Sequence, residues 1–148
     1  PSDSLARQRE GLALLAGVLP LEALTKGRTD EQTAKFERFP LRALFRALHV
    51  VPDKTDVVYT ELAARDGYAP EQCWMVGNSP RSDVNPARRA GWRTVLVAHA
   101  APWHHELEPL VDVGHPTLVA RTFADVPGLI LTAARVAAIG GRTVGGPR

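Results

Sequence analysis

Three short segments of the chain carry polar or charged side chains directly after an apolar stretch. They are Thr25-Lys26-Gly27, Pro52-Asp53-Lys54-Thr55 and Gly77-Asn78-Ser79-Pro80-Arg81-Ser82-Asp83. In the first, the Thr25 hydroxyl and the backbone N–H groups of a turn can bind the oxygens of a phosphate. In the second, Lys54 lies where a helix is expected to begin, and the helix dipole disfavours a cation there unless an anion is close. In the third, Asn78 and Asp83 offer oxygen ligands of the kind that Mg²⁺ takes.

Each segment taken alone is also compatible with a purely structural role. Thr25 and Gly27 can end a strand and make a turn, and Lys54 can be a solvated surface lysine. Asn78 can shape a turn while Asp83 caps the helix that follows. A functional interpretation therefore requires that the fold bring the three segments together.

The hydrophobic pattern predicts an alternation of helices and strands. Helices are expected over residues 4–17, 30–39, 55–65, 85–90 and 125–139, and strands over residues 18–24, 46–51, 73–76, 93–98 and 117–120. This alternation is typical of an α/β fold with a doubly wound parallel sheet. Ligands of such sheets bind beyond the carboxyl ends of the strands, and each of the three segments follows a predicted strand. We therefore expect the segments to converge on one crevice.

The composition of the chain indicates a globular protein rather than a membrane protein or a nucleic-acid-binding protein. The chain has 148 residues, 45% of them apolar, and a formal net charge of +2, which fits one globular domain without a basic patch for nucleic acid. No run of apolar residues approaches the length of a membrane helix and no leader is evident, so we expect a cytoplasmic protein without a membrane partner. Residues 1–139 are expected to form the core domain. Residues 140–148, with four glycines, are expected to form a flexible tail.

Taken in order, these segments resemble motifs of the haloacid dehalogenase (HAD) superfamily of hydrolases. Thr25 in LTKG, Lys54 in VPDKT and the stretch VGNSPRSDVNPARRAGWRTVLV are similar to the second, third and fourth motifs of that family. The resemblance covers roughly residues 5–130. It implies a Rossmann-like core and Mg²⁺-dependent hydrolysis of a small phosphate monoester through an aspartyl-phosphate.

The resemblance also implies roles for individual residues. Thr25 and Lys26 would bind the transferring phosphoryl group, and Lys54 would stabilise both that group and the nucleophilic carboxylate. Asp83, with the residue at position 78, would hold Mg²⁺ directly or through water. The family usually has Asp where this chain has Asn78, so the site carries one negative charge fewer and Mg²⁺ is expected to bind more weakly.

The first motif of the family, an apolar strand followed by Asp-x-Asp-x-Thr with the nucleophile, is not found in the sequence. In the family this strand lies in the middle of the sheet, between the strands that end here near Thr25 and Gly77. We therefore expect a C-terminal part of a longer protein, inactive alone, whose missing part holds the nucleophile, the central strand and a cap domain. The gap is expected to be filled from outside, by the missing N-terminal segment or by a second copy, because unpaired buried backbone groups are costly.

Three functions are compatible with these observations. The first is the core of a Mg²⁺-dependent phosphatase with a small-molecule phosphate as substrate. The second is a metal-independent 2-haloacid dehalogenase, because Asn78 reduces the need for a cation. The third is a non-catalytic binding or regulatory module that has lost its nucleophile.

Overall fold

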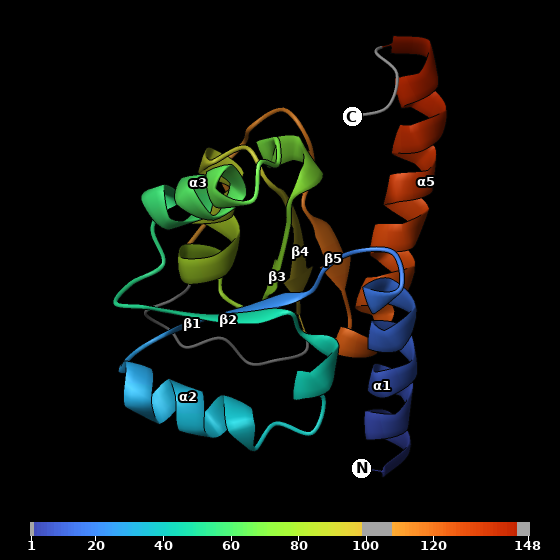
Figure 1. The fold of residues 1–148 in the computed structure, drawn as a ribbon. Coiled ribbons are helices and arrows are strands. Elements are labelled where there is room, and N and C mark those ends of the chain that lie inside the picture. The colour runs from blue at the N-terminus through green and yellow to red at the C-terminus, as the bar shows by residue number, and fades with distance from the viewer. Residues whose placement is uncertain (1, 99–107, 145–148) are drawn as a thin grey trace.

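The computed structural model describes residues 2–98 and 108–144 (Figure 1). The strands are β1 (Glu22–Lys26), β2 (Ala47–Val51), β3 (Trp74–Gly77), β4 (Arg93–Val97) and β5 (Leu118–Ala120). The helices are α1 (Ser2–Ala16), α2 (Thr29–Glu37), α3 (Asp56–Arg65), α4 (Asn85–Arg89) and α5 (Val126–Val144). The predicted alternation of helices and strands is confirmed. None of the described helices is both long and apolar enough to cross a membrane.

All strand pairs are parallel, but the strands form two separate sheets. β1 pairs with β2, in register from Glu22 opposite Ala47 to Lys26 opposite Val51. The second sheet has the order β3-β4-β5. Within the described residues, neither β1 nor β3 has a second strand partner. The architecture is thus the predicted α/β parallel sheet, incomplete between β1 and β3.

Helices cover both faces of the larger sheet, as a doubly wound fold requires. Beneath α3 and α4, a buried cluster contains Tyr59, Ala63, Met75, Ala87 and Trp92. On the other face, where α1 and α5 lie side by side in Figure 1, the cluster contains Leu15, Val95, Val97, Ala120, Val126 and Ile130. Leu24 of β1 packs against the first cluster, and Leu19 and Leu21 pack against the second. Hydrophobic contacts therefore join the two sheets where hydrogen bonds do not.

The first strand lies later in the sequence than predicted. We expected residues 18–24, whereas β1 runs from Glu22 to Lys26. Pro20 has no N–H to donate to a neighbouring strand, which disfavours a strand across it. As a result Thr25 and Lys26 belong to the strand itself, and successive strand side chains point to opposite faces.

The last helix is longer than predicted. We expected it to end at Ile139, but α5 continues to Val144, so Gly140 and Gly141 are helical. A glycine inside a helix costs about 1 kcal/mol relative to alanine, which weakens a helix without ending it. The remainder of the predicted tail, residues 145–148, lies outside the described residues.

A buried arginine holds the segment that leads into β5. The guanidinium of Arg88 donates from Nε to the Val111 carbonyl at 2.8 Å and from Nη2 to the His115 carbonyl at 2.8 Å. Its Nη1 donates to Thr117 Oγ1 at 2.7 Å. One side chain of α4 thereby fixes the path of residues 111–117 beside the sheet.

Candidate functional site

The turn after β3 is built around a short π-helical segment, Pro80–Val84. Ser79 begins it: its Oγ accepts the N–H of Ser82 at 3.0 Å, and its carbonyl accepts the N–H of Val84 at 3.0 Å. A π turn contains one residue more than an α-helical turn, and such turns are frequent at functional sites. Here the turn directs the Asp83 side chain back towards the end of β3.

The Asp83 carboxylate is buried against the backbone of the turn. Its Oδ2 accepts the N–H groups of Asn78 at 3.1 Å and Ser79 at 3.2 Å. A Cβ atom at position 77 would lie 2.2 Å from the same oxygen, so only glycine allows this approach. Gly77 is therefore required here by close contact.

Lys54 forms an ion pair with this carboxylate. Its Nζ donates to Asp83 Oδ1 at 2.6 Å, and the two side chains are only 14% and 7% exposed. Charge-assisted hydrogen bonds are strong, and this one is largely shielded from water. The anion expected beside Lys54 is, within this chain, the carboxylate of Asp83.

A buried tyrosine supports the turn from below, and sequence reasoning missed it. Tyr59 of α3 is fully buried and donates its hydroxyl to the Ser82 carbonyl at 2.9 Å. The α-helical donor for that carbonyl would be residue 86, which is Pro86 and has no N–H. Burial, together with the charge of Asp83, raises the pKa of Tyr59, so its hydroxyl stays protonated as a donor. Pro86 four residues after Ser82 was the one sequence signal that a donor had to come from elsewhere.

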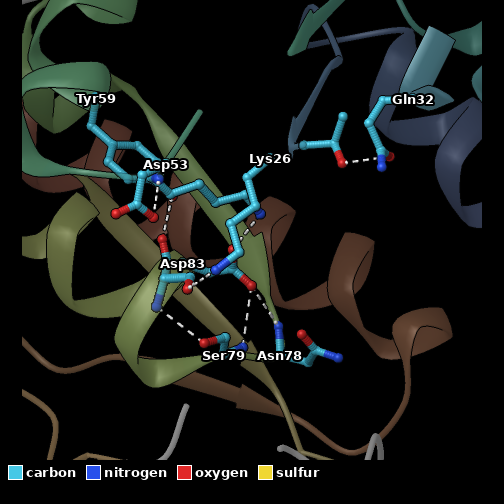
Figure 2. Close-up of polar contacts among 10 residues, drawn as sticks. Lys26, Gln32, Asp53, Tyr59, Asn78, Ser79 and Asp83 are labelled. Carbon is cyan, nitrogen blue, oxygen red and sulfur yellow. Dashed lines mark hydrogen bonds and ion pairs between the residues drawn. The ribbon is translucent and has the colours of Figure 1, made fainter. Parts of the chain in front are cut away.

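Lys26 and Thr25 are neighbours on β1 with different partners. Lys26 Nζ lies 3.4 Å from Ser82 Oγ, so this side chain reaches from the end of β1 to the turn after β3. The Thr25 hydroxyl instead donates to Gln32 Oε1 of α2 at 3.0 Å. Figure 2 shows Gln32 well apart from the group around Asp83.

The structure therefore brings together most of the predicted site. Lys26, Lys54 and Asp83 meet at the turn after β3. Asn78 takes part through its backbone N–H, and Figure 2 shows its side-chain amide extending away from the Asp83 carboxylate. Thr25 lies at the same end of β1 as Lys26 with its hydroxyl engaged elsewhere.

The described residues do not offer a complete set of metal ligands. Among the residues that the structure describes, no group of three or more His, Cys, Asp and Glu side chains could hold one. Both Asp83 oxygens already accept hydrogen bonds, from two backbone N–H groups and from Lys54. Mg²⁺ usually takes one or two carboxylates plus substrate oxygens, so Asp83 with Asn78 is at most part of a magnesium site.

The chain is similar to several proteins of known structure. No curated protein sequence matches the chain. Among solved structures, a haloacid dehalogenase-like family hydrolase from Xanthomonas campestris is 26% identical with a TM-score of 0.74, over 89% of this chain and 55% of that protein. The fold is also similar to a 2-haloacid dehalogenase from Pseudomonas syringae pv. Tomato DC3000 (18% identical, TM-score 0.64, 84% of this chain, 51% of that protein). A predicted phosphoglycolate phosphatase from Haemophilus somnus is 22% identical with a TM-score of 0.64, over 82% and 55% of the two chains.

The chain thus spans about half the length of each of these three proteins. A family model described as HAD-hydrolase-like matches residues 50–126, more than half of the chain. The matched range contains Lys54, the turn after β3 and Asp83. This match agrees with the buried Lys54–Asp83 ion pair beside the carboxyl end of β3. The chain belongs to the HAD-hydrolase-like family.

Proposed function

We propose that the chain is part of a HAD-type hydrolase that acts on a small phosphate monoester. The observation that carries the proposal is the ion pair between Lys54 and Asp83, shielded from water beside the ends of β1 and β3. Phosphoryl transfer depends chiefly on positioning and on neutralising the charge of the transferred group. A shielded lysine held by a fixed carboxylate suits that task.

The reaction also needs a nucleophile that this cluster does not offer, since both Asp83 oxygens are engaged. We place it on an added strand, parallel to β1 and β3 and between them in the sheet order. An N-terminal segment of the same protein would supply that strand, since a second copy of these 148 residues would again lack the Asp-x-Asp-x-Thr motif. Two features support this placement: β1 and β3 each lack a second neighbour among the described residues, and Lys26 approaches the turn after β3.

In the completed site, each residue of this chain has a definite task. Lys54 would hold a phosphoryl oxygen and the nucleophilic carboxylate. Thr25, after leaving Gln32, and Lys26 would donate to the remaining phosphoryl oxygens. Asp83 and the Asn78 amide, with acidic side chains of the added strand, would hold Mg²⁺, which neutralises charge on the phosphoryl group when bound.

The test is complementation of the chain with a peptide. A synthetic peptide with an apolar strand followed by Asp-x-Asp-x-Thr is added to the purified chain, and hydrolysis of p-nitrophenyl phosphate is measured with and without Mg²⁺. We expect hydrolysis only with chain, peptide and Mg²⁺ together. A peptide with the first Asp replaced by Asn, and the Lys54→Ala chain, are the inactive controls, because they lack the nucleophile or the cation beside it.

Other outcomes separate the alternative functions. Chloride release from 2-chloropropionate in EDTA, without phosphatase activity, would identify a metal-independent dehalogenase. Binding of the peptide with an increased melting temperature but no turnover of either substrate would identify a non-catalytic module. Hydrolysis by the chain alone would show that the nucleophile lies within these 148 residues.

A further inference from the structure

A pocket of about 430 Å³ lies beside α4, between Arg88 and the segment that leads into β5. The residues of that segment that line it are Leu110, Val111, Asp112, Gly114, His115, Pro116 and Thr117. Thr117 directly precedes β5, so the pocket lies near the amino ends of the parallel strands β4 and β5, whereas Lys54 and Asp83 follow the carboxyl ends of β2 and β3. Its volume is within the range of about 300–1,000 Å³ that small-molecule sites have. The pocket is therefore a second candidate binding site, separate from the first.

Arg88 brings a positive charge to the wall of this pocket. Its side chain is only 4% exposed, and its three hydrogen bonds go to neutral acceptors, two carbonyl groups and the Thr117 hydroxyl. No carboxylate pairs with it in the described part of the chain, and Glu108, just before the lining segment, lies 3.8 Å from Arg89 Nη2 instead. A guanidinium has five N–H donors, so two of those of Arg88 have no partner there. Because buried charges are usually paired, an anionic ligand would supply what the fold leaves out.

The surroundings of Arg88 are positive as well. Burial lowers the pKa of His115, and the charges of Arg93 and Arg88 lower it further, so this imidazole is uncharged at neutral pH. Its Nδ1 is buried and has no hydrogen-bond partner among the residues that the structure describes. Asp112 is the acidic residue of the lining, and it is exposed, with its Oδ1 accepting the N–H of Gly114 at 3.1 Å. Two arginines against one carboxylate leave the pocket with one net positive charge.

We propose that this pocket binds a small monocarboxylate with a short apolar chain. A carboxylate matches the planar fork of a guanidinium, so it can accept from the N–H groups that Arg88 leaves free. Its single charge equals the net charge of the pocket, which a phosphate dianion would exceed. The apolar residues Leu110, Val111 and Pro116 offer a surface for the hydrocarbon chain. This binding is independent of the hydrolase function, because the pocket contains none of the residues assigned to hydrolysis.

The test is a titration of the isotope-labelled 148-residue chain with butyrate, followed by NMR. Saturable changes are expected at backbone amides within residues 111–117, with none at the amide of Asp83. The pKa of His115 should rise when butyrate is bound, because the anion offsets the charges of the two arginines. Acetate should bind more weakly, since each further CH₂ group that is buried increases the affinity by about fourfold. Inorganic phosphate should also bind more weakly than butyrate at these amides.

Two variants change the charge of the pocket and leave the hydrogen bonds of Arg88 in place. Asp112→Asn keeps an Oδ1 acceptor and is expected to strengthen butyrate binding about threefold, whereas Arg93→Gln should weaken it by a similar factor. Asp53→Asn is the matched control, because Asp53 is also exposed and its Oδ1 also accepts a backbone N–H, that of Lys54. Asp53 follows the carboxyl end of β2, so its variant is expected to bind butyrate as wild type does.

The absence of saturable changes within residues 111–117, or changes centred on Asp83, would overturn the inference. Equal strengthening by Asp112→Asn and Asp53→Asn would also overturn it, as would tighter binding of phosphate than of butyrate. If butyrate binds as expected but peptide complementation yields no hydrolysis, the hydrolase proposal fails and the carboxylate site stands.

Discussion

Replacement of Tyr59 by Phe isolates one hydrogen bond at the base of the site. The Tyr59 ring packs edge-on against Trp92 with centroids 5.2 Å apart, and phenylalanine keeps that contact. What is lost is the hydroxyl that donates to the Ser82 carbonyl at 2.9 Å. Because Pro86 cannot replace the donor and the site is fully buried, the carbonyl is left unsatisfied, which costs about 1–3 kcal/mol.

The assay is equilibrium unfolding in urea. With a denaturant dependence of about 1–3 kcal/mol per molar for a small domain, the midpoint should fall by about 1 M while the slope is unchanged. Tyr68→Phe is the matched control: it removes the same hydroxyl from the chain's other tyrosine, which is 39% exposed, and should change stability by less than about 0.5 kcal/mol. Equal destabilisation by the two variants, or none in Tyr59→Phe, would refute the assignment of the Ser82 carbonyl to this donor.

Three further predictions follow from individual contacts. Gly77→Ala places a Cβ 2.2 Å from Asp83 Oδ2, so the carboxylate must move, and we expect a loss of about 1–3 kcal/mol in urea unfolding. Burial raises the pKa of Glu22, but hydrogen bonds, above all from Arg46, outweigh it and hold the pKa below its ordinary 4.5. Ionised Glu22 therefore stabilises the fold fully above pH 4.5, and this stabilisation is lost as the pH falls through the lowered pKa. The difference in melting temperature between wild type and Glu22→Gln should accordingly shrink below about pH 4. Burial raises the pKa of Cys73 to about 11, so iodoacetamide near pH ~8 should alkylate the native thiol far more slowly than the unfolded one.

The order and type of the elements could be predicted because they depend on local patterns. Apolar stretches that alternate with helical periodicity imply a parallel sheet, and the position of Lys54 at the start of a helix implied an anion nearby. Local pattern could not identify that anion, because Asp83 lies 29 residues further along the chain. The bounds of β1 were harder to predict. A shift of one residue along the strand changes whether Thr25 or Lys26 faces the turn after β3.

Residues whose role depends on distant contacts could not be predicted. In the sequence, Arg88 is one of two arginines in the helix predicted over residues 85–90, whereas in the structure it is buried and hydrogen-bonded to Val111, His115 and Thr117. Tyr59 looks like an ordinary apolar position of α3. Local periodicity shows that such a side chain is buried, but the polar atom that it meets comes from another part of the fold.

The strands β1 and β3 also influence how the chain behaves at high concentration. A strand edge without a partner offers its backbone groups to any other polypeptide, and among the described residues β1 and β3, from different sheets, each have one such edge. Contact between β1 of one copy and β3 of the next would be heterologous, so each addition leaves a new pair of ends and the assembly does not close. Growth of this kind yields polydisperse, concentration-dependent filaments rather than a defined dimer. A complementing strand that pairs with β1 and β3 would occupy both edges, so its co-expression is expected to give a monodisperse preparation.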